Sequence, residues 1–277
     1  MSRRRTNFTR GTKGAFSLIE LIVVVTIGLV LLSIFLPYVR RVRETSNRTA
    51  CANNLQQLGV ALRNYARDNK GFFPRTAYDQ INRPTGWHAF DPRPGALNDV
   101  TAAPWLLVTT AGVKPRLFIC PSTSDTPQTE TNVANFTLPT HLSYSYANPY
   151  SNAVEYGLTE YLKPDFVLLA DLNPGRAGGS DVTGVGTDAS PIDFARANSH
   201  NHARAGQNVL FAAGYVKFVT TPYCGEEGDN IYTALTDYPV FTGQKPPHHV
   251  PGWFGTQYSP AWVTDSYLVP SADSRTP

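Results

Sequence analysis

The first strong pattern in the chain is an apolar run near the N-terminus. From Leu21 to Val39, nineteen consecutive residues carry no charge, which corresponds to about 30 Å of helix and is enough to cross the hydrocarbon core of a bilayer. A single carboxylate, Glu20, lies directly before this run. A carboxylate within a membrane helix costs roughly 2.5 to 3.5 kcal/mol on insertion scales, so Glu20 needs a partner or a special role.

The helical pattern continues beyond the apolar run. Apolar residues recur there at steps of three and four, as expected for one face of a helix, at Cys51, Leu55, Leu58, Leu62 and Tyr65. We therefore predict one helix from Phe16 to about Lys70, with its first half in lipid and its second half packed against the rest of the protein. It should end near Asn69 to Gly71, because Gly terminates helices and Pro74 follows shortly after.

After this helix, short apolar runs alternate with turn residues. The stretch 73–104 is rich in Pro and Gly and predicts irregular structure, and 102–112 predicts a short helix or buried loop. Five runs predict strands: Leu117–Cys120, Ser143–Ala147, Phe166–Asp171, Asn208–Ala212 and Tyr215–Thr220. The last two flank Ala213-Gly214 and should pair as an antiparallel hairpin.

A sheet packed on the amphipathic half of the long helix gives an α+β fold. The predicted boundaries are a basic leader at 1–15, a transmembrane helix at 16–39, its amphipathic continuation at 40–70, an α+β soluble domain at 71–236 and a Pro/Gly/aromatic-rich C-terminal extension at 237–277.

The apolar run has two ordinary interpretations. A cleaved secretory signal would have a shorter core followed by small residues, whereas this core runs into Pro37, Tyr38 and three arginines. A simple signal anchor fits the length, and five basic residues before the run against three just after it favour a cytoplasmic N-terminus. The anchor interpretation leaves Glu20 without a role.

The residues from Lys13 to Glu20, KGAFSLIE, resemble the prepilin-type leader of type IV pilins and type II secretion pseudopilins. The resemblance implies cleavage by a prepilin peptidase after Ala15, with Gly14 as the alternative site. Phe16 then becomes the first residue, Glu20 the fifth and Pro37 the twenty-second, as in the family. It also implies that the amine of Phe16, commonly N-methylated in the family, pairs with Glu20 of a neighbouring subunit in a filament.

Cleavage would change the charge of the chain. The formal net charge of +3 includes five cationic side chains in residues 1–15, which contain no acid. Without them, 19 basic residues face 21 acidic ones, a net charge of −2. The basic isoelectric point therefore gives no support for a nucleic-acid partner.

The residues ACANNLQQLGVALRNYARDNKGFFP at 50–74 are similar to the start of the soluble region in the domain of unknown function 1559 family. The resemblance continues with FICPS at 118–122, SYSY at 143–146, and Asn201-His202 followed by GQNVLF at 206–211. The family has a His, nine intervening residues and then Asp-Gly. Here ten residues separate His202 from Ala213-Gly214, so the spacing is one residue longer. In addition, Ala213 stands where the family has Asp. A plain hairpin turn is the ordinary interpretation, because Gly214 can adopt positive φ.

The histidines and aspartates are residue types that can act as acids, bases or metal ligands, but no spacing among them matches a catalytic or metal-binding signature. We therefore predict no enzyme activity and no cofactor. Two weak metal candidates remain. His200 and His202 would share one face if extended. The loop with Asp171, Asn173 and Asp188 offers oxygen donors for Ca²⁺, although it lacks EF-hand spacing and turn-forming roles are the default.

Three cysteines, Cys51, Cys120 and Cys224, follow the membrane segment and would lie in an oxidising compartment. Cys51 lies on the packing stripe and Cys120 ends a predicted core strand, so a Cys51–Cys120 disulfide is the favoured pairing. Three reduced and buried cysteines remain the alternative.

The resemblance thus implies a structural subunit of a type IV pilus or type II secretion pseudopilus. It would span the inner membrane once with a cytoplasmic N-terminus, and its soluble domain would be periplasmic or extracellular. Its partners would be a prepilin peptidase and copies or relatives of itself. Two alternatives are an anchored module that binds glycans or proteins through its C-terminal region, and an anchored hydrolase that uses the His- and Asp-rich loops.

Overall fold

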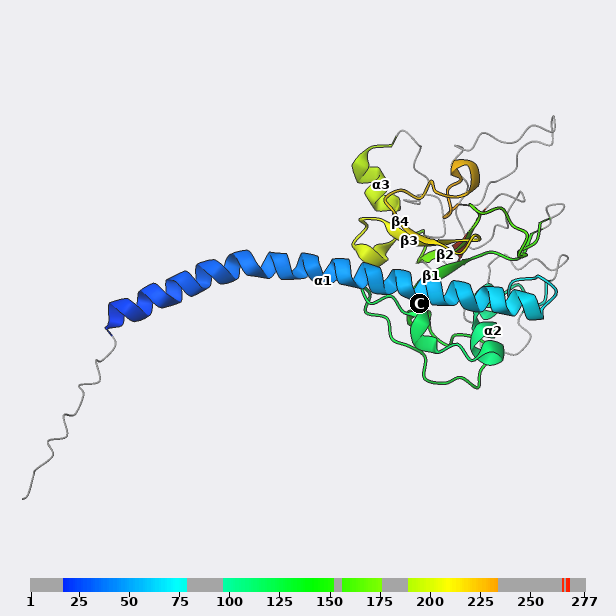
Figure 1. Ribbon diagram of the computed structural model, residues 1–277, viewed down its shortest axis with the longest axis horizontal. Helices are drawn as coiled ribbons and strands as arrows, with labels where there is room; N and C mark the ends of the chain where they lie inside the picture. Colours follow the sequence, from blue (N-terminus) through cyan, green and yellow to red (C-terminus); the bar gives the residue numbers. More distant parts are fainter. Residues whose placement is uncertain are drawn as a thin grey trace, which may run out of the picture. The chain divides into compact units, whose positions relative to one another are not determined.

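The computed structural model describes residues 17–78, 97–151, 156–175, 189–233, 266 and 268–269. The chain divides into two compact units, Met1–Thr45 and Ser46–Pro277 (Figure 1). Helix α1 (Leu18–Asp68) begins in the first unit and ends in the second, so the prediction of one long helix is confirmed. The start of the predicted helix at Phe16 lies outside the described residues.

In the first unit, α1 exposes its apolar side chains on all sides. Its most apolar 18-residue window has a mean hydropathy of 2.8, and none of that window is buried. Within the described part of the chain, α1 is the helix long and apolar enough to cross a membrane. An exposed apolar surface of this extent is typical of a segment that meets lipid or other helices.

In the second unit, α1 presents one buried face. The predicted stripe is confirmed at four positions, Cys51, Leu55, Leu58 and Leu62, each 0% exposed. Tyr65 is only half-buried, and Ala66 takes the next buried position instead. The helix ends where predicted, because Lys70 and Gly71 both have positive φ and the Gly71 N–H donates to the Ala66 carbonyl at 2.8 Å.

A five-stranded antiparallel sheet, in the order β4-β3-β2-β1-β5, forms the other layer of the second unit. With α1 it makes an α+β fold. Its strands are β1 (Tyr144–Ala147), β2 (Val167–Asp171), β3 (Gln207–Phe211), β4 (Val216–Val219) and β5 (Leu268–Val269). Every residue of the three central strands β1, β2 and β3 is buried.

Close approach between α1 and the sheet depends on a glycine. A Cβ on Gly59 would lie 2.9 Å from a terminal methyl group of Leu210 in β3, so a larger residue would force the Leu210 side chain to move. Gly59 therefore acts as a contact point between helix and sheet.

Four of the five predicted strands are confirmed as β1 to β4. The predicted hairpin is confirmed as well, since β3 and β4 pair antiparallel. Its turn contains Gly214 at φ +89°, and the Arg63 guanidinium occupies the space that a Cβ on Gly214 would fill. The Arg63 side chain also donates to the Ala213 carbonyl at 3.2 Å.

The prediction of a strand at Leu117–Cys120 is wrong. Residues Pro115–Phe118 form the 3₁₀ helix η1, because proline favours the first position of a helical turn. Phe118 reaches the core from this turn and packs edge-on against Phe136, with ring centroids 5.2 Å apart.

The remaining short elements complete the second unit. The residues predicted as a short helix or buried loop form α2 (Ala102–Ala111). The sequence did not indicate α3 (Pro191–Ala197), which is capped by Ser190, or β5. The other 3₁₀ helices are η2 (Pro139–His141), η3 (His200–His202) and η4 (Glu226–Gly228).

The buried face of α1 can be tested with a matched pair of truncations. Leu58→Ala should lower the free energy of unfolding by about 2–5 kcal/mol, because it leaves a cavity in the core. Val60→Ala, at a side chain 53% exposed, should change it by about 0.5 kcal/mol or less. Denaturant unfolding of the full chain in detergent, followed by near-ultraviolet circular dichroism, measures both. Equal effects would contradict the packing of this face.

Candidate functional site

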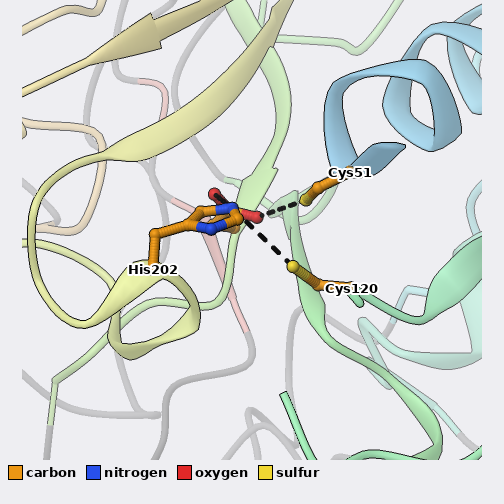
Figure 2. Close-up of side chains that lie close together, drawn as sticks. Cys51, Cys120 and His202 are labelled. Atoms are coloured by element: carbon orange, nitrogen blue, oxygen red, sulfur yellow. Dashed lines mark hydrogen bonds and ion pairs between the residues drawn. The ribbon is translucent and has the colours of Figure 1, made fainter. Parts of the chain in front are cut away.

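Four side chains from separate segments of the chain converge inside the second unit. They are Cys51 of α1, Cys120 just after η1, Asp171 at the end of β2 and His202 at the end of η3. All four are 0% exposed. One ligand atom from each lies within 4.8 Å of those of the other three. Figure 2 shows the two sulfurs and the imidazole pointing toward one another.

The packing of regular elements positions these groups. Cys51 lies on the buried stripe of α1, where its Sγ is 3.3 Å from the Tyr144 hydroxyl of β1. The antiparallel register places Asp171 opposite Tyr144 across the β1–β2 pair. The segment with Cys120 is tied to the same strand region, since the Ser143 N–H donates to the Phe118 carbonyl at 2.9 Å.

The Asp171 carboxylate uses both of its oxygens. Oδ1 accepts from the Cys51 thiol at 3.0 Å and from the Asn201 side-chain amide at 3.1 Å. Oδ2 accepts from the Asn208 backbone N–H at 2.6 Å and lies 3.2 Å from His202 Nε2. A buried carboxylate is costly unless it is hydrogen-bonded in this way.

Three contacts of His202 converge on one ring nitrogen. Nε2 is 3.2 Å from Asp171 Oδ2, 3.7 Å from Cys120 Sγ and 3.0 Å from the Asn208 side-chain nitrogen. In a Cys-His-acid catalytic triad, the nucleophile and the orienting acid bind opposite ring nitrogens. The arrangement around Nε2 therefore does not match a triad, whereas convergence of several donor atoms on one point is what a metal site requires.

The proton affinities of the cluster are coupled by these contacts. Burial acts to lower the pKa of His202, but hydrogen bonds with Asp171 and Cys120 outweigh it and raise the pKa to about 10. The hydrogen bond with Cys51, helped by His202, lowers the pKa of Cys120 to about 7 despite burial. Burial is also the main cause that raises the pKa of Cys51 well above its usual value. Cys120 is thus the thiol of the pair that ionises more readily.

The structure does not bring His200 and His202, the first pair of candidate metal ligands, together. His200 is exposed and contacts Arg204, while His202 is buried, so the two imidazoles do not share one face, as they would in an extended segment. The reason is that residues 200–202 form a 3₁₀ turn, in which alternate side chains diverge. His202 instead joins the cysteines and Asp171.

The proposed calcium loop also has a different arrangement. Asp171 faces the sulfur and imidazole groups, whereas the Asn173 side chain donates to the Tyr232 and Leu268 carbonyls at 3.1 and 2.9 Å. Asp188 lies outside the described residues. The side-chain oxygen of Asn173 accepts from the Gly175 N–H at 2.8 Å, so the oxygen donors of Asp171 and Asn173 serve other contacts.

The structure brings Cys51 and Cys120 together, as the sequence suggested, and both are free thiols. The disulfide stays a prediction. Cys224 is half-buried and also free. Sequence reasoning identified all four members of the cluster but assigned them to three separate expectations. No spacing signal joins them, because each comes from a different element.

At the other end of α1, Glu20 has a local partner. Its carboxylate accepts from the Ser17 backbone N–H at 2.9 Å, and the Ser17 hydroxyl accepts from the Ile19 N–H at 3.3 Å. The Ser-x-x-Glu spacing is that of a capping box, with the serine accepting from the second helical residue, a position that N-cap side chains also use. Pro37 lies inside α1. The predicted cleavage residues Gly14, Ala15 and Phe16 lie outside the described residues.

A family model described as SBP_bac_10, Protein of unknown function (DUF1559), matches residues 40–91. The match supports the domain family that the sequence resembles, over the region that contains Cys51 and the buried face of α1. No curated protein matches the chain significantly, and neither does any solved structure.

The buried ion pair can be tested by removing one charge. Asp171→Asn should destabilise the metal-free protein by about 3–5 kcal/mol, because it leaves the buried His202 without its counter-ion. Asp165→Asn is the matched control at an exposed aspartate, and it should change stability by about 0.5 kcal/mol or less. Denaturant unfolding with a chelator present measures both. A loss for Asp171→Asn no greater than the control would refute a charged pair at this position.

Proposed function

We propose that the protein is a prepilin-like structural subunit. It is anchored by α1 in the inner membrane, cut by a prepilin peptidase after Ala15, and assembled with copies or relatives of itself into a type IV pilus or type II secretion pseudopilus. The observation that carries this proposal is the exposed apolar half of α1, with one carboxylate in its first turn and a prepilin-type leader before it.

The surface of the apolar half suits contact with lipid and with neighbouring helices. The hydroxyls of Thr26 and Ser33 donate to the carbonyls of Ile22 and Val30, both at 2.7 Å, so the helix satisfies these polar groups itself. Gly28 leaves open space where a Cβ would be. Small residues of this kind let helices approach closely in a membrane or filament core.

Glu20 has two roles that must be separated. As a helix cap, it stabilises α1 in a single chain, and a plain anchor would use it in the same way. In a filament, its charge would pair with the new amine at Phe16 of a neighbouring subunit. The capping box accepts Glu or Gln at this position, whereas the charge pair requires Glu.

The compartment and partners follow from the same proposal. The N-terminus faces the cytoplasm, where the peptidase acts, and the second unit faces the periplasm or the outside. The mature chain has a net charge of −2, and nucleic acid is not a proposed partner. Asp171 and Cys120 lie against the same nitrogen of His202. Because a catalytic triad needs the acid and the nucleophile on opposite nitrogens, this arrangement favours a structural role for these residues over a catalytic role in an anchored hydrolase.

Processing can be tested by mass spectrometry of the mature N-terminus in protein purified from native membranes or shed filaments. We expect a terminus at Phe16, or at Ala15 if the alternative site is used. An intact terminus in cells with an active prepilin peptidase would overturn the proposal and favour a permanently anchored binding module.

Assembly can be tested with three variants that separate charge from capping. Glu20→Gln keeps the hydrogen-bond acceptor and removes the charge, Ser17→Ala removes the serine half of the cap and keeps the charge, and Glu20→Ala removes both functions of the glutamate. We expect Glu20→Gln and Glu20→Ala to abolish incorporation into filaments, while Ser17→Ala retains it and all three insert into the membrane. Normal assembly of Glu20→Gln would show that Glu20 acts only as a cap.

A further inference from the structure

We propose that Cys51, Cys120, Asp171 and His202 form a closed, structural Zn²⁺ site. The proposal is independent of how the chain is anchored or assembled, because all four residues belong to the second unit. It is carried by the convergence of four donor atoms of the types that zinc prefers, within 4.8 Å of one another and away from solvent.

The separations between donor atoms fit a tetrahedron around a zinc ion. Zinc binds thiolate sulfur at about 2.3 Å and nitrogen or oxygen at about 2.0–2.2 Å, so neighbouring ligand atoms of a tetrahedral site lie about 3.3–3.8 Å apart. Cys120 Sγ and His202 Nε2 are 3.7 Å apart, His202 Nε2 and Asp171 Oδ2 are 3.2 Å apart, and Cys51 Sγ and Asp171 Oδ1 are 3.0 Å apart. Cys51 and His202 contact different oxygens of Asp171, and the other separations lie within 4.8 Å. Shifts of about 1 Å or less would therefore admit the ion.

The donor set selects the metal. Calcium and magnesium take oxygen ligands in sites of six or more positions. Two sulfurs, one imidazole and one carboxylate instead match a tetrahedral zinc site. All four positions are filled by protein and all four side chains are 0% exposed, which is the arrangement of a structural site and leaves no position for substrate.

Surrounding groups hold the donors in place. The Asn201 amide and the Asn208 backbone N–H fix the Asp171 carboxylate, and the Tyr144 hydroxyl lies 3.3 Å from Cys51 Sγ. Partners of this kind orient the ligands of metal sites and strengthen binding. With the imidazole neutral, the two thiolates and the carboxylate carry three negative charges, and a divalent cation would offset two of them once the thiol and imidazolium protons are released to solvent.

The site would join four elements that are distant in the sequence. It ties the buried half of α1 to the segment after η1, to the end of β2 and to η3. Because such a site does not exist in the unfolded chain, the free energy of metal binding adds to the stability of the fold. We therefore expect zinc to stabilise the packing of α1 on the sheet.

A Cys51–Cys120 disulfide is the rival arrangement. It would consume both sulfurs and leave Asp171 and His202 as an isolated ion pair. The two arrangements differ in metal content and in the number of free thiols, so one purified sample distinguishes them.

The first experiment measures zinc by elemental mass spectrometry in the full chain, purified from membranes in detergent without chelator. Free thiols are counted in the same sample after denaturation with chelator. We expect about one zinc per chain in the wild type and in the matched control Cys224→Ser, with three free thiols in the wild type and two in the control. The zinc content of Cys51→Ser and of His202→Gln should each be roughly one tenth of the wild-type content or less. A Cys51–Cys120 disulfide without zinc, or reduced thiols without zinc, would overturn the proposal.

A second measurement does not depend on whether the ligand variants fold. Metal-stripped wild-type and Cys224→Ser proteins are titrated with Co²⁺, which reports tetrahedral thiolate ligands by its visible and charge-transfer absorption. We expect both proteins to saturate at about one equivalent with a tetrahedral thiolate spectrum, and added Zn²⁺ to abolish it. Loss of the spectrum in Cys224→Ser alone, or its absence in both proteins, would overturn the assignment.

Discussion

The interior of the second unit depends on a buried carboxylate. Asp171 ends the central strand β2 and has no exposed surface, so its charge has to be satisfied without bulk solvent. Its side chain is hydrogen-bonded by residues from three other segments, and its backbone carbonyl accepts from the Tyr232 hydroxyl at 2.9 Å. Helix α1, the turn η3 and the start of β3 can therefore take only positions that bring their donors to Asp171.

The same helix meets two different environments along its length. Its N-terminal part is apolar on every side and exposed, which suits lipid or other helices. Its C-terminal part has one buried stripe and contacts β3 where Gly59 leaves room for Leu210. Because the two parts have different surroundings, a substitution in the N-terminal part can change assembly while the packing of the C-terminal part on the sheet stays unchanged. This separation makes the anchor and the buried cluster independent questions.

The cluster also shows how burial decides between chemical roles. Cysteine, histidine and aspartate together are the residue types of both nucleophilic catalysis and metal binding. Catalysis needs access for substrate and opposite nitrogens of the histidine, whereas a structural ion needs closure and convergence. The four side chains have no exposed surface, and Asp171 and Cys120 both lie against the same nitrogen of His202. Similar chemistry in an open pocket would have suggested a different function.

The linear pattern alone determined the long helix, its apolar and amphipathic halves, its end near Gly71, four strands and one hairpin. These features depend on local periodicity and turn chemistry, which neighbouring residues specify. Glu20 could also be singled out, because a carboxylate at the head of an apolar run is unusual, whereas the three residues around the expected cut follow only from the resemblance to a prepilin-type leader. The strand expected at Leu117–Cys120 failed because Pro115 started a helical turn, and β5 was missed because two residues are too short to show a period.

Only the tertiary structure decided that Cys51, Cys120, Asp171 and His202 meet. Each residue is ordinary in its own segment. Cys51 lies on the buried face of a helix, Cys120 follows a turn, Asp171 ends a strand and His202 ends a short 3₁₀ helix. Their distance from one another depends on the register of β1 with β2, on the approach of α1 at Gly59 and on the turn at η3. None of these has a local signal, since side chains brought together by packing have no fixed spacing along the chain.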